Sequence, residues 1–556
     1  MKLFGVVAAS LASARFVDII DTHSILPWDR LSRNRDVEKK KKPECLKNYT
    51  SPSNDALNKA HKYLEGHGVF DGHNDLPMTY TYLKPKNQDL SKINLYEREP
   101  PGQPDPNIWP QNSQTTIPLA KEGKLRAQFW SIYWGCSANE KDAVLWALEQ
   151  IDVAKRMIAK HDEFIVPKTG SIASIMGLEG GHMIGESLAV LRQFYDLGVR
   201  YMTLTHSCDL PWVTSSNADD KTDVGLSEFG VKVVKEMNRM GMIVDLSHVS
   251  SQTMRDALGN VTAPVMFSHS SARAIADHPR NVPDDVLQLV KRNNGVVMVV
   301  FYAGFVKRGA VEYDENGNTI EICISADDVV DHMIHIGYVI FTSYTSPKTS
   351  LTIVSLLREL IGWDHVGIGA DYNGAEDFPY DGEGKIFQDK YDYFLIMIPR
   401  RKLKGPSPFA NEARWLQKGE LRAKQRYFKR NALERVEGLA WNTRDVSSYP
   451  LVFGKLIERL ENKSRVYTEK DIESIVQRIA SDNILRVWKD VEIEASRLQG
   501  KIEPDWSWIP ENDRTWDESN TYSCKSGRDW PELEEDRDNS ASVASVGLFL
   551  LIASLL

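Results

Sequence analysis

Seven apolar runs recur along the first two thirds of the chain, and most of them finish with His, Asp, Glu or Ser. The runs are "GVFDGHND", "ASIMGLEGGH", "RYMTLTHS", "MIVDLSHVS", "APVMFSHSS", "GVVMVVFY" and "HVGIGADYNG". Each begins with almost continuous apolar residues, which is typical of a buried parallel strand. Helical patterns such as "SLAVLRQFYDLG" and "EFGVKVVKEMNRMG" lie between the runs and end in glycine, a C-cap signal. This alternation predicts an α/β fold.

The place of the polar residues separates two α/β architectures. In a (β/α)8 TIM barrel, the carboxyl ends of all the strands converge on one mouth. In a doubly wound open sheet, ligands gather at a single switch point. Because nearly every run here ends in a reactive residue, we predict a TIM barrel over residues 56–500.

The run "VFDGHNDLP" shows what such a mouth would contain. On a strand the side-chain period is two, so Asp71, His73 and Asp75 project to one side. The residues expected at the mouth are His73, Asp75, Glu179, His206, His248, His269 and Asp371. Each alone has an ordinary explanation, since a strand-end His is often a core residue and an Asp before a helix is often an N-cap. Together they indicate a metal site.

Imidazoles and carboxylates without a thiolate suit Zn²⁺ or a similar divalent ion. We expect His73 and Asp75 to hold one ion, His248 and His269 to complete the shell of a second, and Glu179 to bridge them. Two metals about 3.5–4 Å apart can share a hydroxide and hold it for attack on a carbonyl.

The two ends of the chain predict a secreted, lipid-anchored protein. Lys2 and the apolar run Leu3–Leu11 precede a small-x-small cleavage pattern, as in a signal peptide. The apolar end Val546–Leu556 follows small residues and an acidic segment, as in a GPI-attachment signal. The predicted parts are a signal peptide (1–14), a charged leader (15–55), the catalytic domain (56–500), an acidic stalk (501–540) and a GPI-signal tail (541–556). We expect the protein at the cell surface, on the outer leaflet.

Other counts agree with that compartment. Sequons for N-glycosylation stand at Asn48, Asn260 and Asn462. Five cysteines suit an oxidising compartment, and their odd number leaves at least one outside an intrachain pair. The formal net charge of −9 argues against nucleic acid as a partner, because phosphate binding relies on a basic face.

Several long motifs, in order, resemble one known family. "FDGHNDLP", "GLEGGH", "LTHSC", "VDLSHVS", "FSHSSARAIADHPRNVPDD" and "HVGIGADYNG" are similar to motifs of the membrane dipeptidase (renal dipeptidase) family of binuclear zinc peptidases. The resemblance covers about residues 55–380 and resumes near "SSYPLVFGKLIER" and "IASDNILRV". It implies a barrel of the metal-dependent hydrolase type, in a GPI-anchored homodimer that cleaves dipeptides.

The resemblance also implies residue roles. His73, Asp75, Glu179, His248 and His269 would be the ligands of two zinc ions, as the residue pattern already indicates. His206 would stabilise the oxyanion, and Asp371 would bind the free amino group and carry the proton. Arg280 would bind the terminal carboxylate, assisted by Tyr302. The resemblance further implies a Cys136–Cys208 disulfide, whereas Ala276 occupies the position expected for a cysteine of a second bridge.

Two segments depart from the family pattern, near residues 338–356 and 381–435. We interpret them either as loop insertions, which barrels accept, or as unspliced intron sequence in a gene prediction. The first is rich in Ser, Thr and β-branched residues, which are poor for a helix interior. Two rival functions remain open: another binuclear amidohydrolase on the same barrel, and a surface-anchored binding protein disabled by the insertions.

Overall fold

The structure is a computed structural model that describes residues 50–82, 95–96, 114–139, 141–165, 171–218, 223–307, 311–313, 319–322, 324–342, 362–374, 445–462 and 467–507. All of them belong to one compact unit that extends to Trp508. The predicted signal peptide and GPI tail, the leader up to residue 49, residues 381–435, Asn48, and the remaining cysteines Cys45, Cys323 and Cys524 lie outside the described residues. The last residues of the predicted leader already begin a helix, since α2 starts at Asn54.

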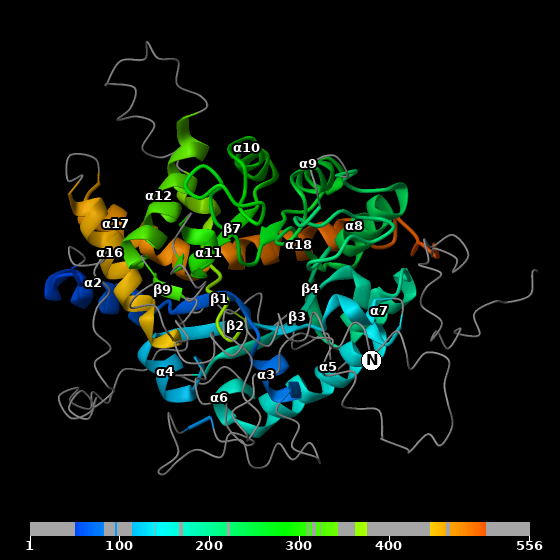
Figure 1. Cartoon of the computed structure of the whole chain (residues 1–556), viewed down its shortest axis with the longest axis horizontal. Helices are drawn as coiled ribbons and strands as arrows, with labels where there is room; N and C mark the ends of the chain where they lie inside the picture. Colours follow the sequence, from blue (N-terminus) through cyan, green and yellow to red (C-terminus); the bar gives the residue numbers. More distant parts are fainter. Residues whose placement is uncertain are drawn as a thin grey trace, which may run out of the picture. The chain divides into compact units, whose positions relative to one another are not determined.

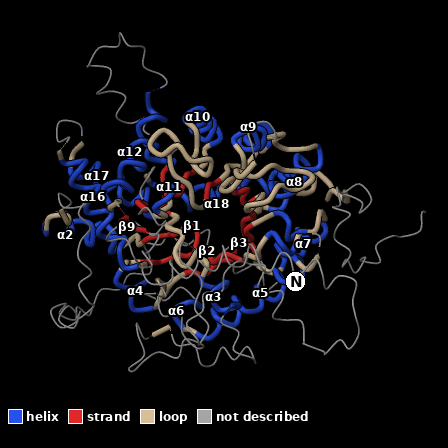
Figure 2. Tube along the Cα trace, in the orientation of Figure 1, coloured by secondary structure: helices blue, strands red, loops and turns tan. Residues whose placement is uncertain are grey.

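Eight parallel strands close into a barrel, which confirms the predicted fold. Their order around the barrel is β1-β10-β7-β6-β5-β4-β3-β2, so the first strand pairs with the last. The strands are β1 (Val69–Asn74), β2 (Leu125–Ile132), β3 (Ala173–Glu179), β4 (Val199–Thr203), β5 (Ile243–Asp245), β6 (Met266–Phe267), β7 (Val296–Val299) and β10 (Val366–Ile368). Figure 2 shows the strands at the centre of the helices.

One barrel strand, β2, is missing from the seven runs read in the sequence. It is buried along most of its length and pairs with both β1 and β3. Its sequence, "LRAQFWSI", carries Arg126 and Gln128 in its first half. The sequence signal required a start of almost continuous apolar residues, and β2 does not have one.

The helices surround the barrel as expected for this fold (Figure 1). They are α2 (Asn54–Glu65), α3 (Leu76–Tyr82), α4 (Ile117–Glu122), α5 (Ala143–Lys160), α6 (Asp162–Ile165), α7 (Leu188–Asp196), α8 (Glu228–Met240), α9 (Ser251–Asn260), α10 (Asp284–Asn293), α11 (Ala303–Val306), α12 (Ala326–Thr342), α16 (Tyr449–Glu461), α17 (Glu469–Gln477) and α18 (Asn483–Leu498). A hairpin of β8 (Val311–Tyr313) and β9 (Thr319–Ile322) follows α11. Ser187 and Ser227 cap α7 and α8 with side-chain oxygens, and Gly241 ends α8 in the left-handed conformation that glycine favours.

The last helix, α18, closes the end of the barrel at which the strands begin. Ile484, Val487 and Val491 on α18 belong to one buried apolar cluster with residues near the strand starts. Those barrel residues are Phe70, Ala127, Phe129, Tyr201, Ile243, Met266, Val296 and Met298. We call this cluster the floor. In Figure 1, α18 runs behind the strands.

Two observations bear on the predicted boundaries. Helix α12 continues to Thr342, so the beginning of the segment near 338–356 is helical although its composition predicts otherwise. Beyond residue 500 the chain still contacts the barrel: Arg192 donates to the Asp505 carbonyl (2.8 Å), and its guanidinium lies over the Trp506 ring. Among the described helices, none combines the length and apolar character needed to cross a membrane.

Candidate metal centre

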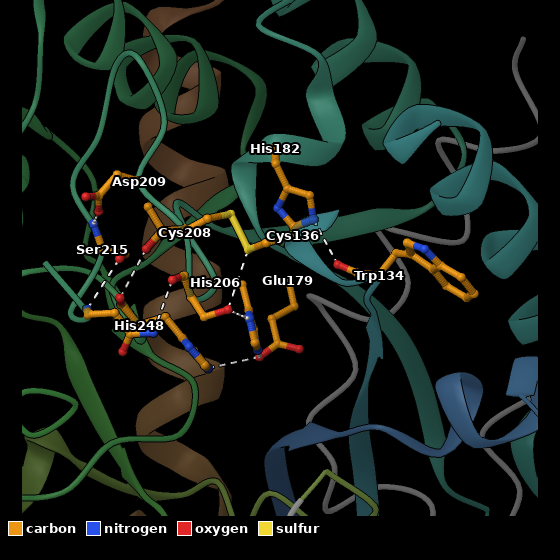
Figure 3. Close-up of a disulfide and its surroundings, with 12 residues drawn as sticks. Trp134, Cys136, Glu179, His182, His206, Cys208, Asp209, Ser215 and His248 are labelled. Atoms are coloured by element: carbon orange, nitrogen blue, oxygen red, sulfur yellow. Dashed lines mark hydrogen bonds and ion pairs between the residues drawn. A yellow bond between two sulfur atoms is a disulfide. The ribbon is translucent and has the colours of Figure 1, made fainter. Parts of the chain in front are cut away.

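Glu179, the last residue of β3, lies at the centre of the predicted constellation. Its Oε1 is 3.1 Å from His248 Nε2, 3.6 Å from His269 Nε2 and 3.9 Å from His206 Nε2. Its Oε2 is 3.5 Å from His73 Nε2. Figure 3 shows Glu179 with His206 and His248 beside it. One carboxylate therefore faces four imidazoles that come from four different strand ends.

The first strand supplies a second group of ligand atoms. His73 Nε2 is 3.2 Å from Asp75 Oδ2 and 3.9 Å from Asp371 Oδ1. Asp75 Oδ1 is buried and has no hydrogen-bond partner among the described residues. The sets His73–Glu179–His269, Glu179–His206–His248 and His73–Asp75–Asp371 each bring their ligand atoms within 4.8 Å of one another. The structure thus brings together all seven residues predicted for the mouth.

Hydrogen bonds at the far ring nitrogens orient two of these histidines. His269 Nδ1 lies 2.8 Å from Ser268 Oγ, and that hydroxyl donates to Asp245 Oδ2 (2.6 Å). Ser268 therefore accepts the Nδ1–H of His269, which leaves Nε2 with its lone pair. His73 Nδ1 lies 3.0 Å from Tyr201 OH, a hydrogen bond that orients this ring as well. A metal takes the nitrogen opposite the hydrogen-bonded one, so this chemistry fits a cation between the Nε2 atoms.

The electrostatics of the centre also fit a cation. Burial lowers the pKa values of His248 and His269 well below their ordinary value, so both rings are neutral near pH 7. Burial raises the pKa values of Glu179 and Asp371. Burial also works against protonation of His73, but Tyr201, Glu179 and Asp75 outweigh it and hold its pKa well above the ordinary value. A bound cation would replace the positive charge that the carboxylates otherwise draw onto His73.

Two site residues have backbone conformations that L residues rarely adopt. His248 has φ +68° and Asp371 has φ +67°. The His248 carbonyl accepts from the backbone N–H of Ser216 (2.7 Å) and from the Thr205 hydroxyl (3.1 Å), which fixes that conformation. Beside Asp371, a Cβ on Gly374 would stand 2.1 Å from Asp75 Oδ2 and 2.6 Å from Asp371 Oδ1. Only glycine lets the chain pass so close to both carboxylates.

His206 lies on the loop after β4, with its ring stacked against the His248 ring at 4.4 Å between centroids. Its ring stands 4.2 Å from the Tyr133 ring, and its Nδ1 is 3.3 Å from Tyr133 OH and 2.9 Å from Ser207 Oγ. The Cys136–Cys208 disulfide is present, as predicted, and ties this loop to the one after β2 (Figure 3). His206 is therefore held by a loop contact and a covalent bridge.

Arg280 approaches the centre from the loop after β6. It is buried, yet its contacts to Ser270 Oγ and to the His269 carbonyl are long (3.4 Å each), and Nε has no hydrogen-bond partner among the described residues. Burial lowers its pKa to about 10, so the guanidinium stays charged at neutral pH. Tyr302 and Arg280 both rest against the Phe305 ring: its centroid lies 4.8 Å from that of Tyr302 and 5.0 Å from the Arg280 guanidinium carbon.

A further cluster near the centre is a bridge rather than a metal site. Cys136, His182 and Cys208 lie within ligand distance of one another, but the disulfide uses both sulfurs. His182 Nε2 is 2.9 Å from the Trp134 carbonyl.

Of the predicted glycosylation sites, Asn260 ends α9 and donates to the Asp256 carbonyl (2.8 Å), while Asn462 is exposed after α16.

The sequence did not identify the residues that support the centre. Ser131 donates to Glu179 Oε2 (3.0 Å), and Tyr133, Tyr201, Asp245 and Ser268 make the contacts described above. Ser268 precedes His269 in the run "MFSHSS" and Asp245 ends the run "MIVD", so the rule for strand ends could have included both. Tyr133 and Tyr201 carry no local signal.

Comparison with known proteins gives one family. The family described as membrane dipeptidase (peptidase family M19) matches residues 57–384. Dipeptidase 3 of Rattus norvegicus is 38% identical over 323 residues, which are 56% of this chain and 56% of that protein. The chain thus matches about half the length of this curated relative.

Solved structures resemble the chain more distantly. An amidohydrolase from Pseudomonas aeruginosa is 18% identical, with a TM-score of 0.48, over 78% of this chain and 98% of that one. A metallopeptidase from Rhodobacter sphaeroides, bound to a phosphinate mimic of the dipeptide L-Ala-D-Ala, is 18% identical, with a TM-score of 0.46, over 76% and 99%.

Proposed function

The chain belongs to the membrane dipeptidase family, and we propose that it is a zinc-dependent dipeptidase that hydrolyses the peptide bond of dipeptides. The observation that carries this proposal is the convergence of four imidazole Nε2 atoms and two further carboxylates, Asp75 and Asp371, around Glu179. The curated relative bears the name dipeptidase, which agrees with this reaction class.

We assign the proposed ligands to two sets that share Glu179. His73 and Asp75 would hold one zinc ion, His248 and His269 the other, and Glu179 would contribute one oxygen to each. Its two oxygens already face the two sides separately, Oε2 towards His73 and Oε1 towards His248 and His269. When bound, the ions supply Lewis acidity that activates water at neutral pH.

The protein's own groups would do the rest of the chemistry. His206, with Nε2 directed to the centre, donates a hydrogen bond to the substrate carbonyl oxygen as negative charge develops there. The Asp371 carboxyl, whose pKa burial raises, takes the proton from the attacking water and returns it to the leaving amine. A raised pKa suits a group that must both accept and release a proton near pH 7.

Arg280 and Asp371 would set the length of the substrate. Arg280 has unused donors for a terminal carboxylate, and Asp371 offers a carboxylate to a free amino group. The two charges would then select a substrate that carries both termini one peptide bond apart. Tyr302 would support the Arg280 side through Phe305.

Metal analysis combined with turnover tests this function. We expect about two zinc ions per chain and hydrolysis of a dipeptide, with much slower hydrolysis of its N-acetyl and C-amide derivatives. The Glu179→Gln variant should lose metal and nearly all activity, because it removes the shared charge while keeping the side-chain shape. Equal rates on the three substrates would contradict the two-charge selection, and unchanged turnover in Glu179→Gln would contradict the assigned roles.

The same measurements separate the rival functions. Hydrolysis of a cyclic amide but not of dipeptides would indicate another amidohydrolase. Full metal content without turnover would indicate a binding protein.

We also propose that the mature protein is a glycosylated homodimer, GPI-anchored to the outer leaflet. Release by a phosphatidylinositol-specific phospholipase tests the anchor.

A further inference from the structure

A second carboxylate on β1, Asp71, is fully buried and takes no part in the proposed chemistry. It lies two residues before His73 and is 0% exposed. Its Oδ1 accepts from the backbone N–H of His73 (2.8 Å) and from Gln128 Nε2 (3.2 Å). Its Oδ2 accepts from the backbone N–H of Ala370 (3.1 Å) and from Tyr449 OH (2.7 Å). Both oxygens are therefore saturated by donors.

Two of these donors belong to the backbone of the proposed site. One is the N–H of His73, which is itself a proposed metal ligand. The other is the N–H of Ala370, the residue directly before Asp371, the proposed proton carrier. β1 and β10 are the first and last strands of the barrel, and they pair at Asp71 and Ile368. We call this junction the seam. Asp71 bonds to the backbone on both sides of the seam, at the residues from which the reactive side chains project.

Tyr449 brings a distant segment to the seam. It is the first residue of α16 and is fully buried, 378 positions after Asp71 in the chain. Its ring packs against Tyr372 at 5.9 Å, and the Tyr372 carbonyl accepts the backbone N–H of Asp75 (3.0 Å). Tyr449 thus contacts both links of the seam, the Asp71 carboxylate and the residue that binds the Asp75 backbone.

All four hydrogen bonds have an Asp71 oxygen as their acceptor. Three of the donors, two backbone N–H groups and one side-chain amide, have no site that could accept a proton from Asp71. Burial holds the pKa of Tyr449 well above its ordinary value, so the phenol keeps its proton and donates it. A side chain with two acceptor oxygens matches these four donors.

We propose that Asp71 and Tyr449 are positioning residues that fix His73 and Asp371 for metal binding and proton transfer. This inference rests on the proposed function, and it deepens that function by assigning part of the machinery to α16. Partners of this kind typically change metal affinity or activity by about 10–100-fold when they are removed. A merely structural role would change stability alone.

The test is Tyr449→Phe, which keeps the ring against Tyr372 and removes only the donated hydrogen bond. Its matched control is Tyr63→Phe on α2, another buried tyrosine whose hydroxyl bonds a carboxylate, Glu469 Oε1 (3.3 Å). The full chain is measured for zinc affinity by chelator competition, for kcat and KM on a dipeptide, and for melting temperature. We expect Tyr449→Phe to weaken zinc binding and lower kcat about tenfold each, with KM within twofold, and Tyr63→Phe to leave all three unchanged.

Asp71→Asn provides a second arm with a larger expected effect, about a hundredfold in both readouts. Zinc affinity and kcat of Tyr449→Phe within twofold of the wild type would overturn the proposal, whatever its melting temperature. Equal losses in Tyr63→Phe would overturn it as well, because the effect would then be general destabilisation. If the wild type hydrolyses no dipeptide, the proposed function fails, and the zinc affinities still decide this inference.

Discussion

The two ends of the barrel are built from different kinds of side chain. At the mouth, buried and half-buried histidines and carboxylates fill the space beyond the strand ends, and two of the half-buried ones, His248 and Asp371, adopt a strained backbone conformation. At the floor, apolar and aromatic side chains from seven strands pack against α18. Buried polar and charged groups cost free energy, whereas buried apolar area stabilises. The costly polar residues of the mouth are therefore explained by the proposed reaction, and the apolar residues of the floor stabilise the fold.

Replacing His206 should change turnover most among the following predictions, without destabilising the fold. His206→Phe keeps a ring against Tyr133 and removes the proposed donor to the substrate oxygen. We expect kcat to fall about 10²–10³-fold, with KM and zinc content close to wild type. Kinetics together with metal analysis check this. Loss of a zinc ion instead would make His206 a metal ligand and would change the assignment of ligands at the mouth.

Removing the Cys136–Cys208 disulfide should lower both the stability of the fold and the turnover. The bridge closes a span of 72 residues, so the double Ser variant should lose about 4 kcal/mol of unfolding free energy in the chain-entropy description. Because the bridge is two residues from His206, we expect kcat to fall by up to about a hundredfold with both zinc ions retained. Denaturant unfolding and kinetics measure these effects. An unchanged kcat would show that Tyr133 alone positions His206.

A substitution at the floor should lower the stability of the fold and leave turnover unchanged, the opposite of His206→Phe. Val487→Ala on α18 removes two buried methyl groups, so the free energy of unfolding should fall by about 1.5 kcal/mol. The strand ends are held by separate contacts, so kcat, KM and zinc content should stay within twofold of wild type. Thermal unfolding and a standard assay are sufficient. A kcat loss comparable to that of His206→Phe would abolish the distinction between the two ends.

The smallest effect at neutral pH is expected at His332 on α12. Its Nε2 donates to the Val306 carbonyl (2.7 Å), and its Nδ1 accepts from the N–H of Ala272 on the loop that leads to Arg280. Burial lowers its pKa to about 4. The unfolded chain gains a proton near pH 6.5 and the folded chain does not. Stability is therefore complete above pH 6.5 and declines towards pH 4, by about 1.4 kcal/mol per unit at most.

His332→Gln should flatten that slope, because glutamine can make both hydrogen bonds and does not titrate. The measurement is denaturant unfolding between pH 7.5 and pH 4.5. Val487→Ala should keep the wild-type slope, since the floor substitution changes no ionisable group. Identical slopes for wild type and His332→Gln would assign the acid sensitivity to other groups.

The sequence predicted the barrel and the seven mouth residues because both depend on one local rule, an apolar strand that ends in a reactive residue. Where this rule did not apply, as at β2, the prediction missed a strand. The supporting residues depend on which strands lie side by side. Tyr201 meets His73 across 128 positions, and Tyr449 meets Asp71 across 378, so no local pattern could pair them. Strand alternation placed Asp71 beside His73 and Asp75 but could not show that it binds backbone donors.

The seam has a consequence for how the protein is made. A ribosome releases β1 long before α16, and the hydroxyl that completes the Asp71 network belongs to residue 449. Translation at about 5–20 residues per second separates the two by tens of seconds. During that interval the nascent chain holds an unfinished cylinder whose reactive groups lack their final alignment. The Asp71 network is therefore complete only when synthesis nears its end, which is a form of timing encoded in the order of the chain.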